Sequence, residues 1–390
     1  MSEKSGSNWS KGLILDKKDA IYAANRFTEY FKNFEHIIDY FKEVKKERIE
    51  KMPQPMFGMS WGDDFFQNWD MHPEDMDFEL RDATSETFHH YLELVASHPN
   101  EASIPGRHIR YMLYEKNTNT IAGFIRLGSP VMSIRPRNQY LDGVVGMNGN
   151  ISLSTFNKHS INGFIIVPAQ PFGFNYLGGK LLAGLCCTAE VKGHLDSKYD
   201  MNTCLFETTS LYGSSKQLSQ YDGMKPFIRF KGLTDSSFSP NMHDGVFLDF
   251  NKWFTEKNDG VRIVDPTVSG RKMKTQMRMI SIIKQSLKEH DEQEYKKFVE
   301  FHKESTNLNE QKRFFISTYG YENVPQIIRG EETELRKAPN FDRYTQQGIL
   351  DWWRPKAARR YEQLKKDGRL RTSLEIWSET FDIDILREGK

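Results

Sequence analysis

Asn162-Gly-Phe-Ile-Ile-Val-Pro168, Thr203-Cys-Leu-Phe-Glu207 and the residues between them form the stretch that decides the fold. Both runs are short and apolar, as strands are. The first leads into a turn with three glycines, Ala169-Gln-Pro-Phe-Gly-Phe-Asn-Tyr-Leu-Gly-Gly179, and then into a long apolar helix over about 177–195. After the second strand we expect a short helix near 214–221 and a last strand at Phe227-Ile-Arg-Phe-Lys231. The stretch therefore predicts an α+β fold.

The composition is that of a folded, aromatic-rich globular protein. The 390 residues are 38% hydrophobic and 13% aromatic, which argues against extensive disorder. A chain of this length exceeds the usual single core, so one enlarged domain or two domains are expected. The 54 Lys and Arg balance 53 Asp and Glu, so overall charge gives no reason to invoke nucleic acid or an anionic membrane.

The remaining composition indicates a soluble cytoplasmic protein. The three cysteines, Cys186, Cys187 and Cys204, lie in apolar segments and suit buried reduced thiols better than a disulfide or a nucleophile. No histidine pairs with cysteine or carboxylate at a familiar zinc spacing, so we expect no metal. No secretory signal and no membrane-spanning run is apparent.

Helical patterns flank the central strands. Residues 17–52 place aromatic side chains at spacings of three and four, which predicts one long amphipathic helix ended by Pro53. Its aromatic stripe either packs on the protein's own core or receives a partner, including a second copy of the chain. Residues 84–95 predict another helix, and 267–303 a long helix or a helical pair. We expect a helical region at 1–100, a core at 101–265 and a helical extension at 266–390.

A hairpin and a polar loop precede the decisive stretch. Ile109–Glu115 and Thr120–Leu127 alternate apolar and polar residues around Lys-Asn-Thr-Asn, a strong hairpin signal. The following run, which contains Arg135, Arg137 and Asp142, is expected to be an exposed loop. It either contacts a substrate or forms an ordinary solvated surface.

The order of these elements through about 125 residues resembles the fold of GNAT-type acyltransferases. The resemblance implies a central mixed sheet in which two parallel strands splay apart, flanked here by the helical additions at both ends. In that fold the gap accepts the pantetheine arm of acetyl-CoA or another acyl donor, and helix N-terminal N–H groups face its phosphates. The cofactor residues that the resemblance implies are Val167, Ala169, Gly173, Asn175, Gly178 and Gly179.

The glycine turn departs from the pattern of that family. The family turn resembles Arg/Gln-x-x-Gly-x-Gly/Ala. Aligning its last small residue with Gly178 puts Tyr176 where glycine is expected and Gly173 where arginine or glutamine is expected. A tyrosine side chain there could block the close approach of backbone to pyrophosphate.

A second resemblance is closer residue by residue. The segments Arg137-Asn-Gln-Tyr-Leu-Asp-Gly, Gly163-Phe-Ile-Ile-Val-Pro and Leu205-Phe-Glu-Thr-Thr-Ser-Leu-Tyr-Gly are similar to the domain of the Druantia anti-phage protein A group. That domain is similar in arrangement to GNAT-like enzymes, including the phage Mom-type DNA-base modifiers. The likeness covers about 110–240 and implies a phage or anti-phage context.

Glu207 and Tyr221 are the candidate catalytic residues. Glu207 ends the second strand, where a substrate would meet the splayed strands, and is a candidate general base or substrate orienter. It equally fits a carboxylate that bonds the nearby hydroxyls of Thr208, Thr209 and Ser210. Tyr221 precedes Gly223 much as the family's acid tyrosine precedes a glycine, although it stands one residue closer. The alternative role for Tyr221 is an aromatic packed under the last strand.

The segment Arg343–Arg371 carries nine basic and three acidic residues, with Trp352, Trp353 and Tyr361 interleaved. Such a segment either binds nucleic acid, with rings stacked on bases, or is a solvated helix face.

Three functions follow from these observations. The first is a GNAT-like transferase that moves an acyl or related group onto a nucleic-acid base or other polymer, with Glu207 as base and Tyr221 as acid. The second is a noncatalytic binding or assembly protein on a degenerate GNAT-like core, which Tyr176 favours. The third is a sequence-tolerant DNA-binding component of a defence complex.

Overall fold

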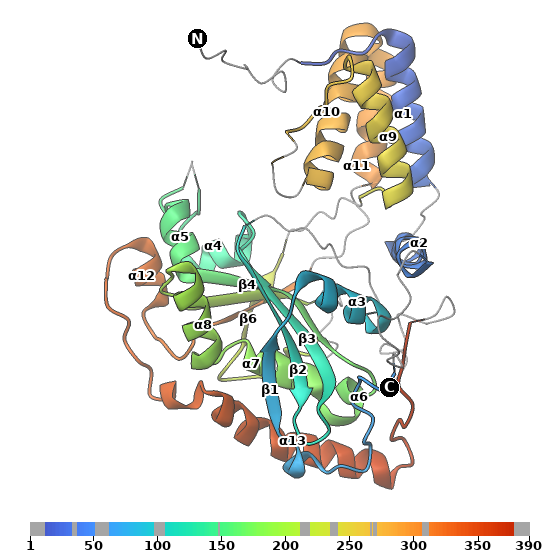
Figure 1. Cartoon of the computed structure of the whole chain (residues 1–390). Helices are drawn as coiled ribbons and strands as arrows, with labels where there is room; N and C mark the ends of the chain where they lie inside the picture. Colours follow the sequence, from blue (N-terminus) through green and yellow to red (C-terminus); the bar gives the residue numbers. More distant parts are fainter. Residues whose placement is uncertain are drawn as a thin grey trace, which may run out of the picture. The chain divides into compact units, whose positions relative to one another are not determined.

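The computed structural model describes residues 12–32, 37–50, 62–96, 106–146, 149–210, 219–234, 241–265, 267, 271–305 and 312–377. Within these residues the chain forms two compact units (Figure 1). The first contains five helices: α1 (Lys17–Lys32), α2 (Ile37–Glu50), α9 (Asp244–Lys257), α10 (Arg271–His290) and α11 (Glu292–Ser305). The second contains the sheet and the remaining helices. The structure thus has the expected mixed α+β class.

The first unit is a helical cluster built on an aromatic core. Phe27 and Phe31 of α1 are buried, and Phe27 meets Phe298 of α11 edge to face at 5.5 Å. Residues 17–32 and 37–50 are helical, as α1 and α2, where a single helix over 17–52 was expected; residues 33–36 and Pro53 lie outside the described residues. Of the two alternatives expected at 267–303, the helical pair is confirmed as α10 and α11; Met273 and Met277 of α10 are exposed.

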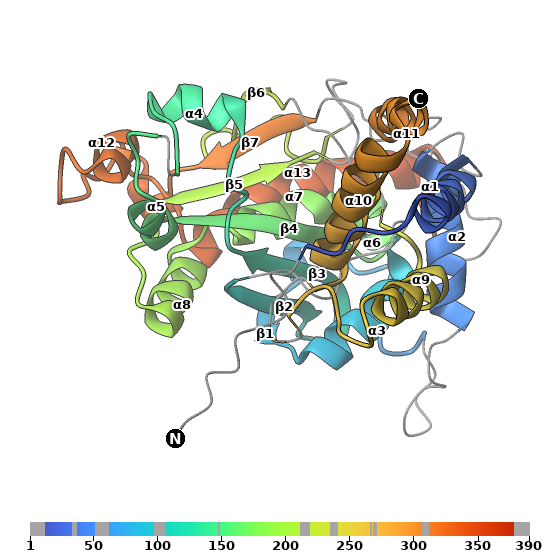
Figure 2. The ribbon, with the colours of Figure 1, turned by 90° about the horizontal axis from the view of Figure 1, so that it is seen from above.

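The second unit is built on a seven-stranded sheet in the order β1-β2-β3-β4-β5-β7-β6 (Figure 2). The strands are β1 (Phe78–Asp82), β2 (His108–Glu115), β3 (Thr120–Gly128), β4 (Ser160–Pro168), β5 (Leu205–Thr209), β6 (Arg229–Leu233) and β7 (Arg313–Ser317). The β2–β3 pair confirms the predicted hairpin. All neighbouring strands in the sheet are antiparallel except β4 and β5.

Strands β4 and β5 pair in parallel over four residues and then part. Their register runs from Ser160 opposite Leu205 to Gly163 opposite Thr208. Beyond that point β4 continues to Pro168 along β3, whereas β5 ends at Thr209. The two strands therefore share only the first half of β4.

Helices cover both faces of the sheet. On one face lie α6 (Phe172–Tyr176), α7 (Gly178–Leu185), α8 (Ala189–Tyr199) and α13 (Gln346–Lys366). On the other lie α3 (Ser85–Val95), α4 (Arg135–Leu141), α5 (Leu153–His159) and α12 (Val324–Arg329). Short 3-10 helices occupy Pro73–Asp75 and Phe341–Arg343. Buried apolar side chains fill the space between the sheet and the helices on each face.

Several predicted elements differ from the observed ones. The expected helix at 177–195 is two helices: α7 ends at Leu185 with Cys186 as its C-cap, and the Thr188 hydroxyl caps α8 by accepting from the Val191 N–H. The glycine turn contains α6, and the last strand is Arg229–Leu233. The helix expected near 214–221 falls largely outside the described residues, and 219–223 form a turn.

The two units do not follow the expected division at residues 101 and 266. Strand β1 comes before residue 101, and β7 and α13 come after residue 266, yet all three belong with the sheet. Helix α9, which lies within 101–265, belongs to the helical unit. Strand β7 lies between β5 and β6 and pairs with both, although about a hundred residues of sequence separate it from β5.

Close packing of α7 on the sheet makes a specific demand on Gly123 of β3. Replacing Gly123 with Ala should lower the midpoint of thermal unfolding, because its Cβ would lie 2.6 Å from Leu182 Cδ1 and 2.9 Å from the Val167 carbonyl oxygen. Overpacking of this kind costs about 1–3 kcal/mol. Gly193→Ala is the matched control: its Cβ meets nothing within 4 Å in α8, so alanine should stabilise the helix by about 0.5–1 kcal/mol. Calorimetric melting of both variants checks this, and equal shifts would contradict it.

Candidate functional site

The segment expected to bind an acyl donor is packed into the core. Ala169, Asn175, Gly178 and Gly179 are buried, whereas Val167 and Gly173 are partly exposed. Tyr176, the residue at the expected glycine position, is fully buried, and its hydroxyl donates to the carbonyls of Trp69 and Met71. The Tyr176 side chain thus joins this turn to the segment that contains Trp69 and Met71.

Helix α13 and the residues after it bond directly to this segment. Trp353 Nε1 donates to the Tyr176 carbonyl at 2.9 Å, and the Tyr361 ring stacks on the Tyr176 ring at 5.3 Å. Asn175 exchanges two hydrogen bonds with the backbone of Arg371, one from its amide Nδ2 to the carbonyl and one from the Arg371 N–H to its Oδ1. The polar groups of α6 are therefore engaged by the C-terminal part of the chain.

The residues after β5 fill the place where β4 and β5 part. Gln220 Nε2 donates to the Ile166 carbonyl of β4 at 2.9 Å. A Cβ added to Gly179 would lie 2.2 Å from Gln220 Oε1, so this side chain rests against the start of α7. Lys180 of α7 donates to the carbonyls of Gln220 and Asp222. These contacts occupy the edge of β4 to which the GNAT resemblance assigns the pantetheine arm, and they do not fit an acyl-CoA in that position.

Glu207 forms a buried ion pair with Arg137. Both side chains are fully buried, and Arg137 NH1 lies 3.1 Å from Glu207 Oε1. Desolvation raises the pKa of Glu207 from 4.5 to about 7, against the opposing effect of the Arg137 charge and hydrogen bond. The partner of this carboxylate is thus an arginine of α4, and no hydrogen bond from Thr208, Thr209 or Ser210 to it is seen.

The run 135–142, expected to be an exposed loop, is helix α4 followed by its C-cap. Arg137 is buried beneath it, with its guanidinium 4.4 Å from the Phe156 ring and its NH1 and NH2 donating to the carbonyls of Val131 and Met132. Arg135 is exposed, and Asp142 is an exposed C-cap with φ of 49°. The three residues assigned to substrate binding therefore do not converge. Pro136 at a first-turn position was the available signal for a helix here.

Tyr221 lies on the other side of the sheet from Glu207. Its ring is buried against Phe315 at 5.2 Å, and its hydroxyl accepts from Thr208 Oγ1 at 3.4 Å. Thr208 and Glu207 are consecutive residues of β5 and point to opposite faces, as strand geometry requires. The structure does not bring the candidate base and the candidate acid together.

The aromatic residues of the basic segment 343–371 are not available for stacking on bases. Trp352, Trp353 and Tyr361 are all buried in the sheet core. Arg360 is also engaged, because its Nε donates to the Phe174 carbonyl and its guanidinium lies over the Phe174 ring. Exposed basic side chains remain at Lys356, Arg359, Lys366 and Arg369.

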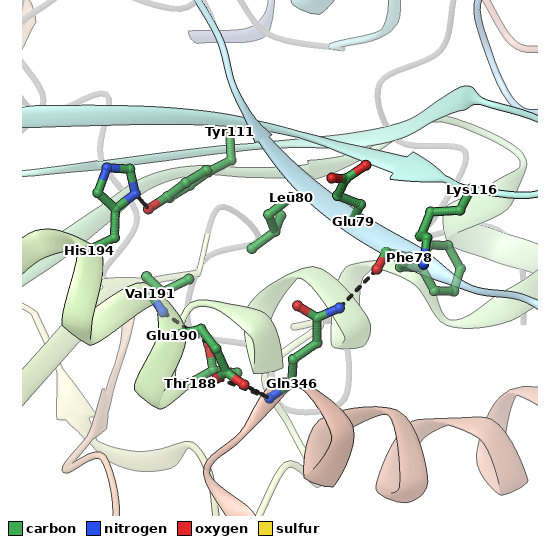
Figure 3. A pocket seen from close by; sticks show the side chains of 10 residues that line it. All are labelled: Phe78, Glu79, Leu80, Tyr111, Lys116, Thr188, Glu190, Val191, His194 and Gln346. Carbon is green, nitrogen blue, oxygen red and sulfur yellow. Dashed lines mark hydrogen bonds between the residues drawn. The ribbon is translucent and has the colours of Figure 1, made fainter.

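A surface cleft lies between β1 and α8 in the sheet unit (Figure 3). Its volume is about 320 Å³, and Leu80 and Val191 face each other across it. At one end Tyr111 Oη lies 2.7 Å from His194 Nδ1, and His194 Nε2 lies 3.6 Å from Asp82 Oδ2. Burial raises the pKa of the Tyr111 phenol. Sequence patterns did not identify this cleft, because its residues come from four separate segments and form no local motif.

The described residues contain no cluster of His, Cys, Asp and Glu suited to a metal ion. Cys186, Cys187 and Cys204 are buried free thiols, and burial raises the pKa of each. Within the same part of the chain, none of the helices combines the length and apolarity needed to span a bilayer.

The raised pKa of Glu207 predicts a pH dependence of stability. Between about pH 4.5 and pH 7 the folded carboxyl retains a proton that the unfolded chain releases, so the free energy of unfolding should fall as pH rises. The fall attributable to this group is about 3 kcal/mol. Urea unfolding of the wild type and of Glu207→Gln, followed by circular dichroism across this range, measures it as a difference. A difference that stays constant with pH would contradict the assignment.

Comparison with known proteins gives one finding. No curated protein and no solved structure gives a significant match to the chain. A family model, described as Druantia protein DruA, matches residues 32–220. This match takes in strands β1–β5 with Arg137 and Glu207, and it supports a relationship of the chain to the DruA family.

Proposed function

We propose that this chain is an anti-phage defence protein in which a GNAT-like sheet serves as a scaffold for binding and assembly. The DruA match implies the anti-phage context. The sheet supports the GNAT-like part, because its parallel neighbours β4 and β5 pair over four residues and then diverge between antiparallel strands. We place the protein in the cytoplasm as part of this proposal.

The observation that carries the proposal is the filling of the gap between β4 and β5. Gln220 bonds to the Ile166 carbonyl, and α13 holds Tyr176 by a hydrogen bond and a stacked ring. Both features consist of side chains that occupy the space beside β4 and α7, where an acyl-CoA would otherwise approach the backbone. The location of Glu207 and Tyr221 on opposite faces of β5 supports the same conclusion.

A scaffold of this kind acts through its surfaces. The exposed Lys356, Arg359, Lys366 and Arg369 favour contact with phosphate groups of nucleic acid. Because the aromatic rings of the same segment are buried, such contact would be electrostatic, independent of base identity and weakened by salt.

Group transfer is the second candidate function, and the environment of Glu207 favours it. A carboxyl with its pKa near 7 is suited to accept a proton at neutral pH, and strongly shifted groups are enriched at functional sites. The competing explanation is structural, because Arg137 neutralises the carboxylate and both side chains are inaccessible to solvent.

The first test is a titration with an acyl donor. Isothermal calorimetry of the full chain with acetyl-CoA at millimolar concentration should give no binding heat, because Gln220 and its neighbours occupy the edge of β4. Adenosine 3′,5′-bisphosphate, which lacks the pantetheine arm, serves as the control for contacts made only by the nucleotide. Binding of acetyl-CoA that Gln220→Trp abolishes would place the donor in this gap and would contradict the scaffold proposal.

The second test separates the two roles of Glu207. In a plaque assay with cells that the wild type protects from phage, Glu207→Gln should retain protection, because glutamine is close in size and still offers Arg137 a carbonyl oxygen. Loss of a general base would instead lower activity by about 10²–10⁴-fold. Protein level and melting temperature of the variant serve as controls. Loss of protection by a variant that is folded and present would favour group transfer.

A further inference from the structure

Among the described strands β1 is an edge of the sheet, and alternate residues of β1 direct their backbone polar groups outward. The N–H groups of Lys116 and Ala83 donate to the carbonyls of Asp77 and Arg110, which fixes the ladder between β1 and β2. In an antiparallel pair these bonds recur at every second residue. Residues 79 and 81 therefore direct their backbone N–H and C=O groups toward β2. Phe78, Leu80 and Asp82 direct theirs away from the sheet.

The first of these outward groups already has partners in the protein. The Phe78 carbonyl accepts from Gln346 Nε2 at 2.8 Å, and the Phe78 N–H donates to Asp77 Oδ1 at 2.9 Å. The side-chain amide of Gln346 thus takes the position of a neighbouring strand's first N–H. No described residue bonds to the backbone N–H or C=O of Leu80, the next outward residue. The unpaired part of the β1 edge therefore begins after Phe78, whose carbonyl is already bound by Gln346.

The cleft lies directly below this free edge. Leu80 lines it from β1, and Val191 and His194 line it from α8 (Figure 3). In an antiparallel pair, side chains of directly opposed residues lie on the same face of the sheet. A residue opposite Leu80 on an added strand would therefore direct its side chain into the cleft, whose volume of about 320 Å³ accommodates a leucine or a phenylalanine.

Two carboxylates indicate the charge of the occupant: Glu190 lines the cleft, and Asp82 lies beside it, 3.6 Å from the lining residue His194. Asp82 has His194 as its partner, and Glu190 accepts from the Gln346 backbone N–H. Among the described residues neither has a Lys or Arg partner, in contrast to the nearby pairs Lys116–Asp77 and Arg81–Glu79. A strand with a basic side chain on each side of its apolar one would complement both.

We propose that β1 binds an extended polypeptide segment of a partner protein by antiparallel strand addition, with one apolar side chain in the cleft and basic side chains beside it. Strand addition takes affinity from main-chain hydrogen bonds and specificity from the pockets for alternate side chains. Leu80 supplies the N–H and C=O, and Leu80 with Val191 supplies the pocket. This inference gives the scaffold proposed above a partner class and rests on that binding role.

The test uses a defined peptide and two variants of one residue. The probe is fluorescein-labelled Lys-Thr-Lys-Thr-Leu-Thr-Lys-Thr-Lys amide, whose leucine and lysines share one face, and binding to the full chain is measured by fluorescence anisotropy. Leu80→Ala and Leu80→Pro both remove the side chain, but only proline removes the outward N–H. Proline is tolerated at an edge position whose N–H faces outward, so the ladder to β2 should persist.

Wild type should bind the peptide, and Leu80→Pro should bind at least about tenfold more weakly than Leu80→Ala, which is a loss of about 1.4 kcal/mol. Methylation of the leucine nitrogen in the peptide should cause a similar loss with wild-type protein, because that N–H faces the Leu80 carbonyl. Replacing the peptide lysines with glutamates should also weaken binding. Circular dichroism and melting temperature confirm that both variants are folded.

Three results would overturn the proposal. They are no binding of the peptide to wild type at millimolar protein, equal binding by the proline and alanine variants, and a wild-type dimer in sedimentation that Leu80→Pro dissociates. The last result would assign the edge to a second copy of this chain. None of these measurements involves acetyl-CoA or Glu207, so failure here is distinguishable from failure of the scaffold proposal.

Discussion

The parallel contact between β4 and β5 is the interaction on which the sheet unit depends. It joins an antiparallel half, β1 to β4, to a second antiparallel half made of β5, β7 and β6. Only four residues of each strand take part, ending at Gly163 and Thr208, where Thr208 Oγ1 donates to the Gly163 carbonyl. Gly163 is required at this point, because a Cβ there would lie 2.9 Å from the Phe206 ring. A short junction of this kind needs reinforcement from both faces.

The Arg137–Glu207 pair reinforces one face. Charges buried without solvent are costly, and a buried ion pair is weak evidence for stability by itself. Its effect here is positional, because Arg137 links β5 through Glu207 to the chain at Val131 and Met132 through two carbonyls. On the other face, Gln220 and Lys180 tie the turn after β5 to β4 and α7. The same residues that close the junction therefore decide whether it can accept a ligand.

The sequence was sufficient where structure depends on neighbours in the chain. The hairpin at β2 and β3, the apolar strand β4 and the capped helix α3 all follow from local periodicity and turn residues. It was insufficient where pairing is distant, as for β7, whose run Arg313-Phe-Phe-Ile-Ser317 is apolar but carries no sign of its partners. The prediction of the site was incomplete for a related reason. Glu207 was predicted to be a functional carboxylate, but nothing near it in the sequence indicates its partner Arg137, which is seventy residues away. Gln220 and Gln346 act through single side-chain amides that no pattern distinguishes.

Tyr176 and helix α13 are best understood together. A tyrosine in place of the expected glycine is a departure from the GNAT pattern when the turn is considered alone, and the C-terminal helix is an addition without a counterpart. In the structure the two complete each other, since Trp353 bonds to the Tyr176 carbonyl, Tyr361 stacks on its ring and the Tyr176 hydroxyl reaches back to Trp69. A glycine at 176 would keep the carbonyl that Trp353 bonds but would remove the ring on which Tyr361 stacks, and a chain without α13 would lack both contacts. In this chain the turn 169–179 is therefore the docking site of the C-terminal helix α13.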